Sequence, residues 1–154
     1  MQKADDILDF LNTKLGDESL VWKGEHASIK FEDGIVVDLI KVDMQTIELV
    51  HIFDKYTGVA DATFCSNVLM ANYQGGMTGQ SRLSLTPDFK SLSLCCRIDV
   101  RATDTVLFEE TMTEFLKYVH FWQSDEAAGY LDGTELEDEQ APTQQDAEAF
   151  FTRV

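Results

Sequence analysis

The order of helical and strand-like segments in this chain predicts an α+β protein built on an antiparallel sheet. Amphipathic helical segments stand at residues 3–15 and from Asp104 onward, with alternating strand-like segments and one more helix between them. Because the strands come in groups and do not alternate strictly with helices, an antiparallel sheet is expected. A length of 154 residues suits a single domain.

The first half of the chain predicts a helix followed by a three-strand meander. Apolar side chains recur at helical spacing in residues 3–15, and Gly16 follows as a helix stop. Residues 27–32 alternate between apolar and polar side chains, and Asp33-Gly34 predicts a two-residue type I′ hairpin turn. Residues 35–42 and 46–53, rich in β-branched side chains, complete the meander.

The second half adds a helix, a hairpin and a closing helix. Residues 60–73 predict a helix with a broad apolar side, ended by Gly75-Gly76. Residues 81–86 and 91–100 predict two strands, of which the second should bury one face and leave the other partly wet. Asp104 suits the N-cap of the last helix. The expected order is therefore α-β-β-β-α-β-β-α, a twisted antiparallel sheet flanked by helices.

Acidic side chains dominate the composition and exclude two classes of partner. The chain has 28 Asp and Glu against 12 Lys and Arg, a formal net charge of -16. Such a charge argues against nucleic-acid binding, which needs basic side chains, and against docking on anionic membranes. No apolar stretch is long enough to span a membrane, and the first residues do not resemble a signal peptide. The three cysteines are a poor disulfide framework, so a cytoplasmic protein is expected.

The charge is concentrated at the end of the chain. Residues 124–154 hold 9 of the 28 acidic side chains and 1 of the 12 basic ones, a net charge of -8. Half of the excess charge thus lies in a fifth of the chain. This predicts one domain at residues 1–123 and an acidic, flexible C-terminal tail at residues 124–154.

Nothing in the sequence indicates an active site. His26, His51 and His120 lack the spacing of zinc ligands. Cys95-Cys96 is not a redox CxxC motif, and Gly75-Gly76 lacks the lysine of a phosphate-binding loop. We therefore expect no catalytic residues, no metal and no cofactor.

The segments together resemble the class I type III secretion chaperones of the Tir-chaperone (CesT/SycE-like) family. The resemblance covers roughly residues 3–123. It rests on the leading helix, the three-strand meander, the Gly-rich break, the long closing helix and the marked acidity. It also rests on two local sequences, Val68-Leu69-Met70-Ala71-Asn72-Tyr73 and Leu83-Ser84-Leu85 followed by Leu92-Ser93-Leu94-Cys95-Cys96-Arg97-Ile98.

The resemblance implies a cytoplasmic homodimer of a Gram-negative bacterium. Such a chaperone binds the N-terminal region of one or a few secreted effectors in extended form before export, and hydrolyses no nucleotide. The secretion ATPase is a further candidate partner. In the family the second helix and the fourth strand commonly build the dimer interface, here residues 60–73 and 81–86. The interface residues expected on that basis are Phe64, Val68, Leu69 and Leu83.

A physical mechanism for peptide binding can be stated from the residues themselves. Residues 27–32, the first strand of the meander, are a candidate sheet edge where an extended peptide adds through main-chain hydrogen bonds. Lys30 and Glu32 suit an exposed edge, because charges there discourage self-association. Apolar grooves beside the first helix would hold hydrophobic anchors of the effector. The candidate effector-binding residues are Phe10, Ile29, Phe31, Leu39 and Ile47, each of which could equally belong to the ordinary core.

Two other functions stay open at this point. An acidic binding module could imitate a nucleic acid and occupy the basic groove of a partner, although half of the excess charge lies in the tail and not across a folded face. A small enzyme of the same fold would need a convergent polar pocket, which the sequence does not predict.

Overall fold

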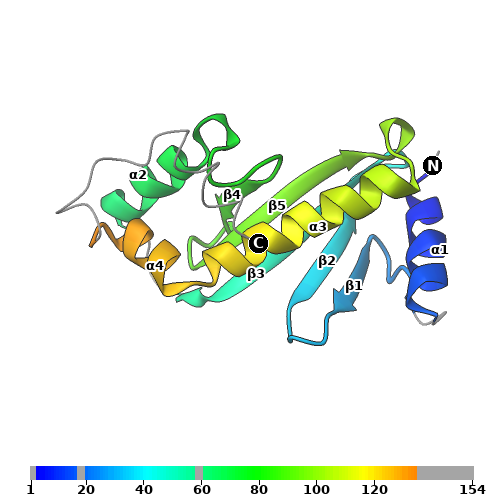
Figure 1. The fold of residues 1–154 in the computed structure, drawn as a ribbon, viewed down its shortest axis with the longest axis horizontal. Helices are drawn as coiled ribbons and strands as arrows, with labels where there is room; N and C mark the ends of the chain where they lie inside the picture. Colours follow the sequence, from blue (N-terminus) through cyan, green and yellow to red (C-terminus); the bar gives the residue numbers. More distant parts are fainter. Residues whose placement is uncertain (1–2, 17–19, 58–60, 135–154) are drawn as a thin grey trace.

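The computed structural model describes residues 3–16, 20–57 and 61–134, which form an α+β fold (Figure 1). The helices are α1 (Ala4–Leu15), α2 (Ala62–Ala71), α3 (Thr105–Trp122) and α4 (Asp125–Asp132). The strands are β1 (His26–Lys30), β2 (Val36–Lys41), β3 (Thr46–Thr57), β4 (Arg82–Leu85) and β5 (Ser91–Asp99). Short 3₁₀ turns lie at Tyr73–Gly75 and Val100–Ala102. The predicted class and the predicted order up to α3 are confirmed.

The five strands form one antiparallel sheet in the order β1-β2-β3-β5-β4. The central pair, β3 with β5, runs from Thr46 opposite Asp99 to Thr57 opposite Ser91, with an irregularity after Phe53. The edge strands are β1 and β4. The expectation that the first strand of the meander lies at an edge is therefore confirmed.

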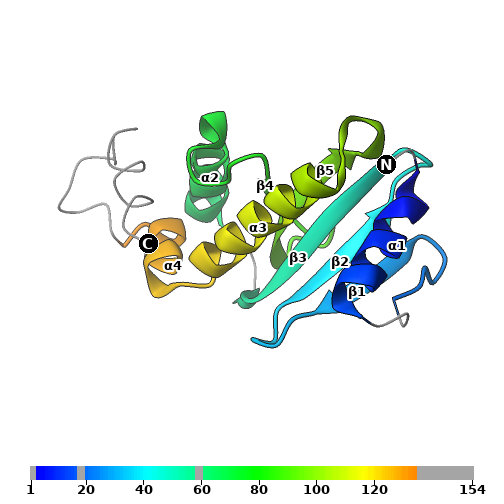
Figure 2. The same ribbon diagram turned by 45° about the vertical axis from the view of Figure 1, so that its right-hand side comes forward.

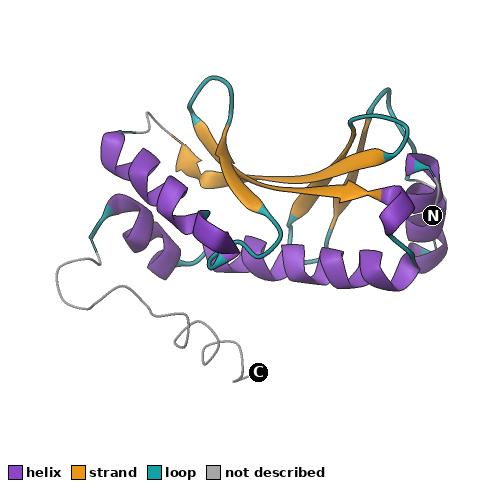
Figure 3. Cartoon of the chain, turned by 90° about the horizontal axis from the view of Figure 1, so that it is seen from above, coloured by secondary structure: helices purple, strands orange, loops and turns teal. Residues whose placement is uncertain are grey.

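The helices cover one face of the sheet. Helix α3 runs along the sheet, with α1 near one end and the neighbouring helices α2 and α4 near the other (Figures 1 and 2). Seen from above, the opposite face carries no helix of the described residues (Figure 3). The core lies between the layers, where Phe108, Phe115 and Trp122 of α3 are almost completely buried. The buried positions of α1 and α3 recur at helical spacing, as the sequence pattern predicts.

The predicted helix ends have simple local causes. Asp104 is the N-cap of α3, and its carboxylate accepts a hydrogen bond from the Leu107 N–H at 2.9 Å. Asp61 caps α2 in the same way through the Phe64 N–H at 2.8 Å. Gly16 ends α1 in the left-handed conformation, with a φ of 65°.

The predicted two-residue turn between β1 and β2 is wrong. The Phe31 N–H donates to the Ile35 carbonyl at 2.8 Å, so three residues, Glu32, Asp33 and Gly34, form the loop. Of these, Gly34 has a positive φ, 90°, whereas a type I′ turn needs two such residues. Asp33 stabilises the loop through its side chain instead, because its carboxylate accepts from the Ile35 N–H at 3.1 Å.

The outer face of β5 is partly wet, as predicted, because Arg97 and Asp99 are exposed, but its middle is buried. Ser93 and Cys95 are 6% and 7% exposed, although no described helix covers them. Arg82 of β4 lies opposite Cys95 and reaches across β5 to form an ion pair with Glu48 of β3. Long side chains from the neighbouring strands thus lie beside the middle of β5.

The fold continues past Gln123, where the sequence predicts a flexible tail. The Ser124 hydroxyl caps α4 by accepting from the Ala127 N–H at 3.1 Å. Ala127 and Leu131 are completely buried, and Asn67 of α2 donates to the carbonyls of Tyr130 and Leu131 at 3.0 and 3.1 Å. Residues 124–134 therefore pack against the domain, and the remaining predicted tail, residues 135–154, lies outside the described residues.

Candidate binding surfaces

At the β4 edge of the sheet, a side chain takes up the outward main-chain groups of Leu83. The Asn72 amide Nδ2 donates to the Leu83 carbonyl at 3.0 Å, and its Oδ1 accepts from the Leu83 N–H at 2.8 Å. The neighbouring Thr86 N–H bonds to Ser91 of β5, so the alternation of an antiparallel ladder turns the Leu83 groups outward. Asn72 thus occupies the site where an added strand would bond.

The edge at β1 is open over two residues. The Lys41 N–H bonds to the Glu25 carbonyl, and the Phe31 N–H bonds to the Ile35 carbonyl. In β1 the main-chain groups of odd-numbered residues therefore point toward β2, and those of even-numbered residues point away from the sheet. Lys23 pairs with His26 and closes the first outward position. Ser28 and Lys30 follow it, and no described segment pairs with them on the outer side. A peptide strand could bond there.

The structure separates the predicted effector-binding residues into two groups. Ile29, Leu39 and Ile47 are 5%, 0% and 0% exposed and belong to the core between sheet and helices. In this chain they present almost no surface to a partner, which is the core alternative that the sequence left open. Phe10 and Phe31 are partly buried and pack against the core, so part of each ring is accessible.

Phe10 lies where α1 meets the first turns of α3. Its ring meets the edge of Phe108 at 6.0 Å between centroids, and Lys14 forms an ion pair with Glu109 at 2.5 Å. Val106 and Leu107, in the same turn as Phe108, are exposed, as is Leu15 at the end of α1. Exposed apolar side chains thus occur on both helices around this contact, a feature that often marks a protein-binding surface.

Helix α2 is apolar on both of its sides. The predicted interface residues Val68 and Leu83 are buried within the chain, and Phe64 is half-buried against Tyr56, with 6.1 Å between the ring centroids. Leu69, the fourth, is 73% exposed. Met70 and Tyr73 are also exposed, and we call these three residues the α2 stripe. A helix that is apolar all round is normally covered on all sides, so the stripe is a candidate subunit interface.

Two members of the α2 stripe, Met70 and Tyr73, are missing from the sequence-based selection. They could have been found, because Leu69 and Tyr73 are four residues apart and Met70 is adjacent to Leu69. The pattern was obscured because the opposite side of the helix, with Val68 and Ala71, is equally apolar and is the one that faces the core.

The polar chemistry of the described residues does not converge on a catalytic centre. No group of three or more His, Cys, Asp and Glu side chains in the described part of the chain could hold a metal ion. Burial raises the pKa of both the Cys95 and the Cys96 thiols, which keeps them protonated and weakly nucleophilic. In the same residues, no helix is long and apolar enough to cross a membrane.

Solved structures with the same fold include type III secretion chaperones. The chain is similar to a protein in the ExsC–ExsE complex, with a TM-score of 0.62 and 18% identity over 80% of this chain and 95% of that one. A chain of the HopA1–SchA chaperone–effector complex is similar with a TM-score of 0.61 and 12% identity, over 77% of this chain and 91% of that one. A chain in the structure of the Yersinia pestis type III secretion chaperone SycH with a fragment of YscM2 has a TM-score of 0.56 and 17% identity, over 75% of this chain and 96% of that one. A search of curated proteins finds no match.

The fold is therefore that of the type III secretion chaperones, proteins without enzymatic activity. Residues 6–123 match the model of the Tir chaperone protein (CesT) family, and the chain belongs to this family. The matched region ends just before α4, so the helix packed against α2 is an addition to the part that the family model describes.

Proposed function

We propose that this chain, a type III secretion chaperone by family, binds the N-terminal segment of one or a few effectors in extended form and keeps it soluble and competent for secretion. The observation that carries this proposal is the asymmetry of the sheet edges. At β4 the main-chain groups of Leu83 are taken up by Asn72, whereas β1 presents Ser28 and Lys30 without a described partner.

Strand addition at β1 would supply affinity with little sequence preference. Each main-chain hydrogen bond contributes about 0.5–1.5 kcal/mol net. Side chains of the effector would supply selectivity by packing against exposed apolar residues, each contributing up to about 1.5–3 kcal/mol. Phe10 and Phe31 are the candidate contacts from the sequence that retain accessible surface, and Leu15 and Leu107 extend this candidate surface.

This mode of binding selects polypeptides that are not yet folded. A folded effector has its own backbone groups paired, so it cannot offer an extended segment to the β1 edge. The excess of 16 negative charges on the chaperone would keep a complex with an apolar client in solution and favour a basic client segment.

The chaperone is proposed to act as a homodimer through the α2 stripe. In one twofold-symmetric interface, the stripes of the two subunits would meet and cover Leu69, Met70 and Tyr73 on both. The family resemblance also supports a cytoplasmic location in a Gram-negative bacterium and the secretion ATPase as a further partner.

Co-expression with a client tests the proposal. The full chain is produced with the N-terminal segment of the exported protein encoded beside its gene, and the complex is analysed by hydrogen exchange. We expect the segment to co-purify and the amides of Ser28 and Lys30 to gain protection. The matched control is the same client without its N-terminal segment, which should not be retained. A monomer that retains no such segment would contradict the proposal.

A further inference from the structure

Strands β2 and β3 stop pairing with each other before either strand ends. Their ladder runs from Lys41 opposite Ile47 to Asp38 opposite Val50. Beyond this point β2 remains paired with β1 as far as Val36, and β3 remains paired with β5 as far as Thr57. The two strands diverge in this part of the sheet (Figure 1). We call the space between them the β2–β3 gap.

Main-chain groups of both strands point into the β2–β3 gap. The Val42 N–H bonds to the Thr46 carbonyl, so the alternation of the ladder turns Val36 and Ile52 toward each other. These two residues are not paired in the sheet. The Val36 carbonyl instead bonds to Nδ1 of His51 at 2.7 Å. A histidine side chain thus takes up a carbonyl that an adjacent strand would normally bond.

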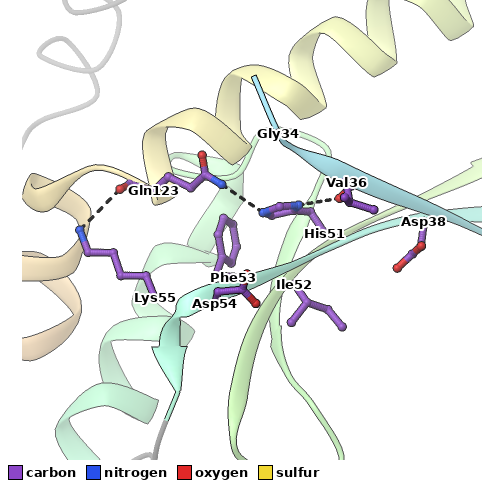
Figure 4. Close-up of a pocket in the computed structure, with 9 residues that line it drawn as sticks. All are labelled: Gly34, Val36, Asp38, His51, Ile52, Phe53, Asp54, Lys55 and Gln123. Atoms are coloured by element: carbon purple, nitrogen blue, oxygen red, sulfur yellow. Dashed lines mark hydrogen bonds between the residues drawn. The ribbon is translucent and has the colours of Figure 1, made fainter. Parts of the chain in front are cut away.

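The β2–β3 gap contains a pocket of about 530 Å³, lined on one side by Gly34, Val36 and Asp38 and on the other by residues 51–55 (Figure 4). Its volume lies within the roughly 300–1,000 Å³ of typical ligand sites. His51 is buried, and its Nε2 lies 3.3 Å from Nε2 of Gln123, which completes the lining. Because the Val36 carbonyl can only accept, Nδ1 carries the proton and Nε2 accepts from the Gln123 amide.

The charge around the β2–β3 gap favours a cation. Asp38 and Asp54 both line the pocket. The lysine in the lining, Lys55, is already bonded to the Asp125 carboxylate at 2.6 Å and to the Ser124 carbonyl at 3.1 Å. The Lys55 ammonium is therefore compensated by groups at the start of α4. The carboxylates of Asp38 and Asp54 then give the pocket a negative electrostatic potential.

We propose that the β2–β3 gap binds a short extended peptide segment that carries a basic side chain. The main chain of the segment hydrogen-bonds to β3 at Ile52, on the side where β2 has left it. The basic side chain pairs with Asp54 and Asp38. This proposal rests on the proposed function, because a client in extended form supplies the segment, and it adds a second site that is separate from the β1 edge.

A peptide titration of the full chain tests the site directly. The probes are two blocked pentapeptides, Thr-Val-Arg-Val-Thr and Thr-Val-Glu-Val-Thr, added to ¹⁵N-labelled protein. The arginine peptide should shift the amide resonances of Val36, Ile52 and Asp54 in a saturable manner. The glutamate peptide should bind at least about tenfold more weakly, because it loses a charge-assisted hydrogen bond and meets like charge.

Charge variants separate this site from general electrostatics. Asp54→Lys and the milder Asp54→Asn should each weaken the arginine peptide, the former by about tenfold or more. Glu110→Lys makes the same change in net charge at an exposed position of α3 and should leave binding unchanged. The proposal is overturned if the arginine peptide shifts Ser28 and Lys30 alone, or if Asp54→Lys and Glu110→Lys have equal effects.

The client complex distinguishes the two proposals. If the wild-type chain retains a client segment and Asp54→Lys retains it equally well, the gap is not a client site and the proposed function stands. If no client is retained but the arginine peptide still shifts Ile52 and Asp54, the gap binds peptides and the proposed function fails.

Discussion

The side-chain amide of Asn72 bonds to the backbone of Leu83 as a neighbouring strand would, with one donated and one accepted hydrogen bond of 3.0 and 2.8 Å. The residue after α2 thereby blocks the Leu83 position at the outer edge of β4. An unpaired edge invites another chain, so this contact directs strand addition to the opposite edge, at β1. It also ties α2, the candidate subunit interface, to the sheet.

Replacing Asn72 with alanine should open the β4 edge. We expect Asn72→Ala to lower the free energy of unfolding by about 1–3 kcal/mol, because two main-chain groups lose their partner. It should also increase self-association, measured by light scattering beside urea denaturation. Asn12→Ala is the matched control, since Asn12 makes the same pair of bonds to Leu20, which lies in a loop. Equal aggregation of the two variants would contradict the role of Asn72 at the edge.

The sequence pattern was sufficient for the elements that depend on local periodicity. The stripe of α1, the alternation of β1 and the cap at Asp104 were all predicted and are confirmed in place. These features arise from contacts within a few residues or from one buried face, which a periodic pattern records directly.

Features that depend on contacts between distant residues could not be predicted. The ion pair beside the buried Cys95 joins Glu48 and Arg82, which come from two other strands. The acidic side chains of residues 124–154 predict a tail in place of helix α4. Its local signals were present, namely the cap at Ser124 and the buried pair Ala127 and Leu131, four residues apart.

The same distinction applies to the candidate binding surfaces. The edge position of the first strand follows from its place in the meander and was predicted. Which of the apolar residues remain accessible depends on how helices cover the sheet, so Leu39 and Ile47 could not be told from Phe10 by pattern alone. The β2–β3 gap has no sequence signature, because both strands keep their alternation through it.

A charge in the α2 stripe should separate the proposed dimer. Leu69→Lys should raise the dimer dissociation constant by about a hundredfold or more, because a twofold interface loses the buried side chain twice. The subunit should stay folded, since Leu69 makes little contact within the chain. Sedimentation velocity measures the effect, and Val106→Lys, exposed on α3, is the control. A wild-type monomer, or a dimer insensitive to Leu69→Lys, would refute the assignment of this interface.

A proline in β1 should block strand addition without disrupting the sheet. The Ser28 N–H faces outward, so Ser28→Pro removes a donor that β2 does not use and adds a ring on the edge. Binding of the client segment should weaken by roughly tenfold, measured by calorimetry. Ser28→Ala removes the hydrogen bond of the hydroxyl to Asp38 but keeps the N–H, and should bind normally. Equal affinities of the two variants would place the client elsewhere.

Truncating the buried leucine of α4 should show whether this helix stabilises the domain. Leu131 is completely buried, so Leu131→Ala should lower the free energy of unfolding by about 2–5 kcal/mol. Glu126→Ala changes an exposed position of the same helix and should have little effect. Urea denaturation monitored by tryptophan fluorescence suits the measurement, because Trp122 packs against Tyr130 of α4. A loss of less than about 1 kcal/mol would show that α4 is only loosely attached.

The phenol of Tyr56 should make the domain sensitive to alkaline pH. Its hydroxyl donates to the Trp122 carbonyl at 2.7 Å, and burial, reinforced by the negative charges of Asp132 and Asp125, raises its pKa to about 12. In the unfolded chain a tyrosine ionises near pH 10. The folded state therefore retains a proton that the unfolded state releases, and the contribution of Tyr56 is full below about pH 10 and is lost as pH rises toward 12.

Denaturation of two tyrosine variants between pH 9 and pH 12, the window set by these pKa values, isolates this effect. Tyr56→Phe should be less stable than wild type at neutral pH, because the hydrogen bond is lost, but its stability should fall less steeply above pH 10. Tyr73→Phe changes a ring of the α2 stripe that is exposed in the single subunit, and it serves as the control in the Leu69→Lys background, where the slope of the parent variant is expected. If Tyr56→Phe and wild type lose stability in parallel across this range, the pKa of the phenol is the same in the folded and unfolded states. In that case burial of Tyr56 beside the end of α3 does not raise its pKa.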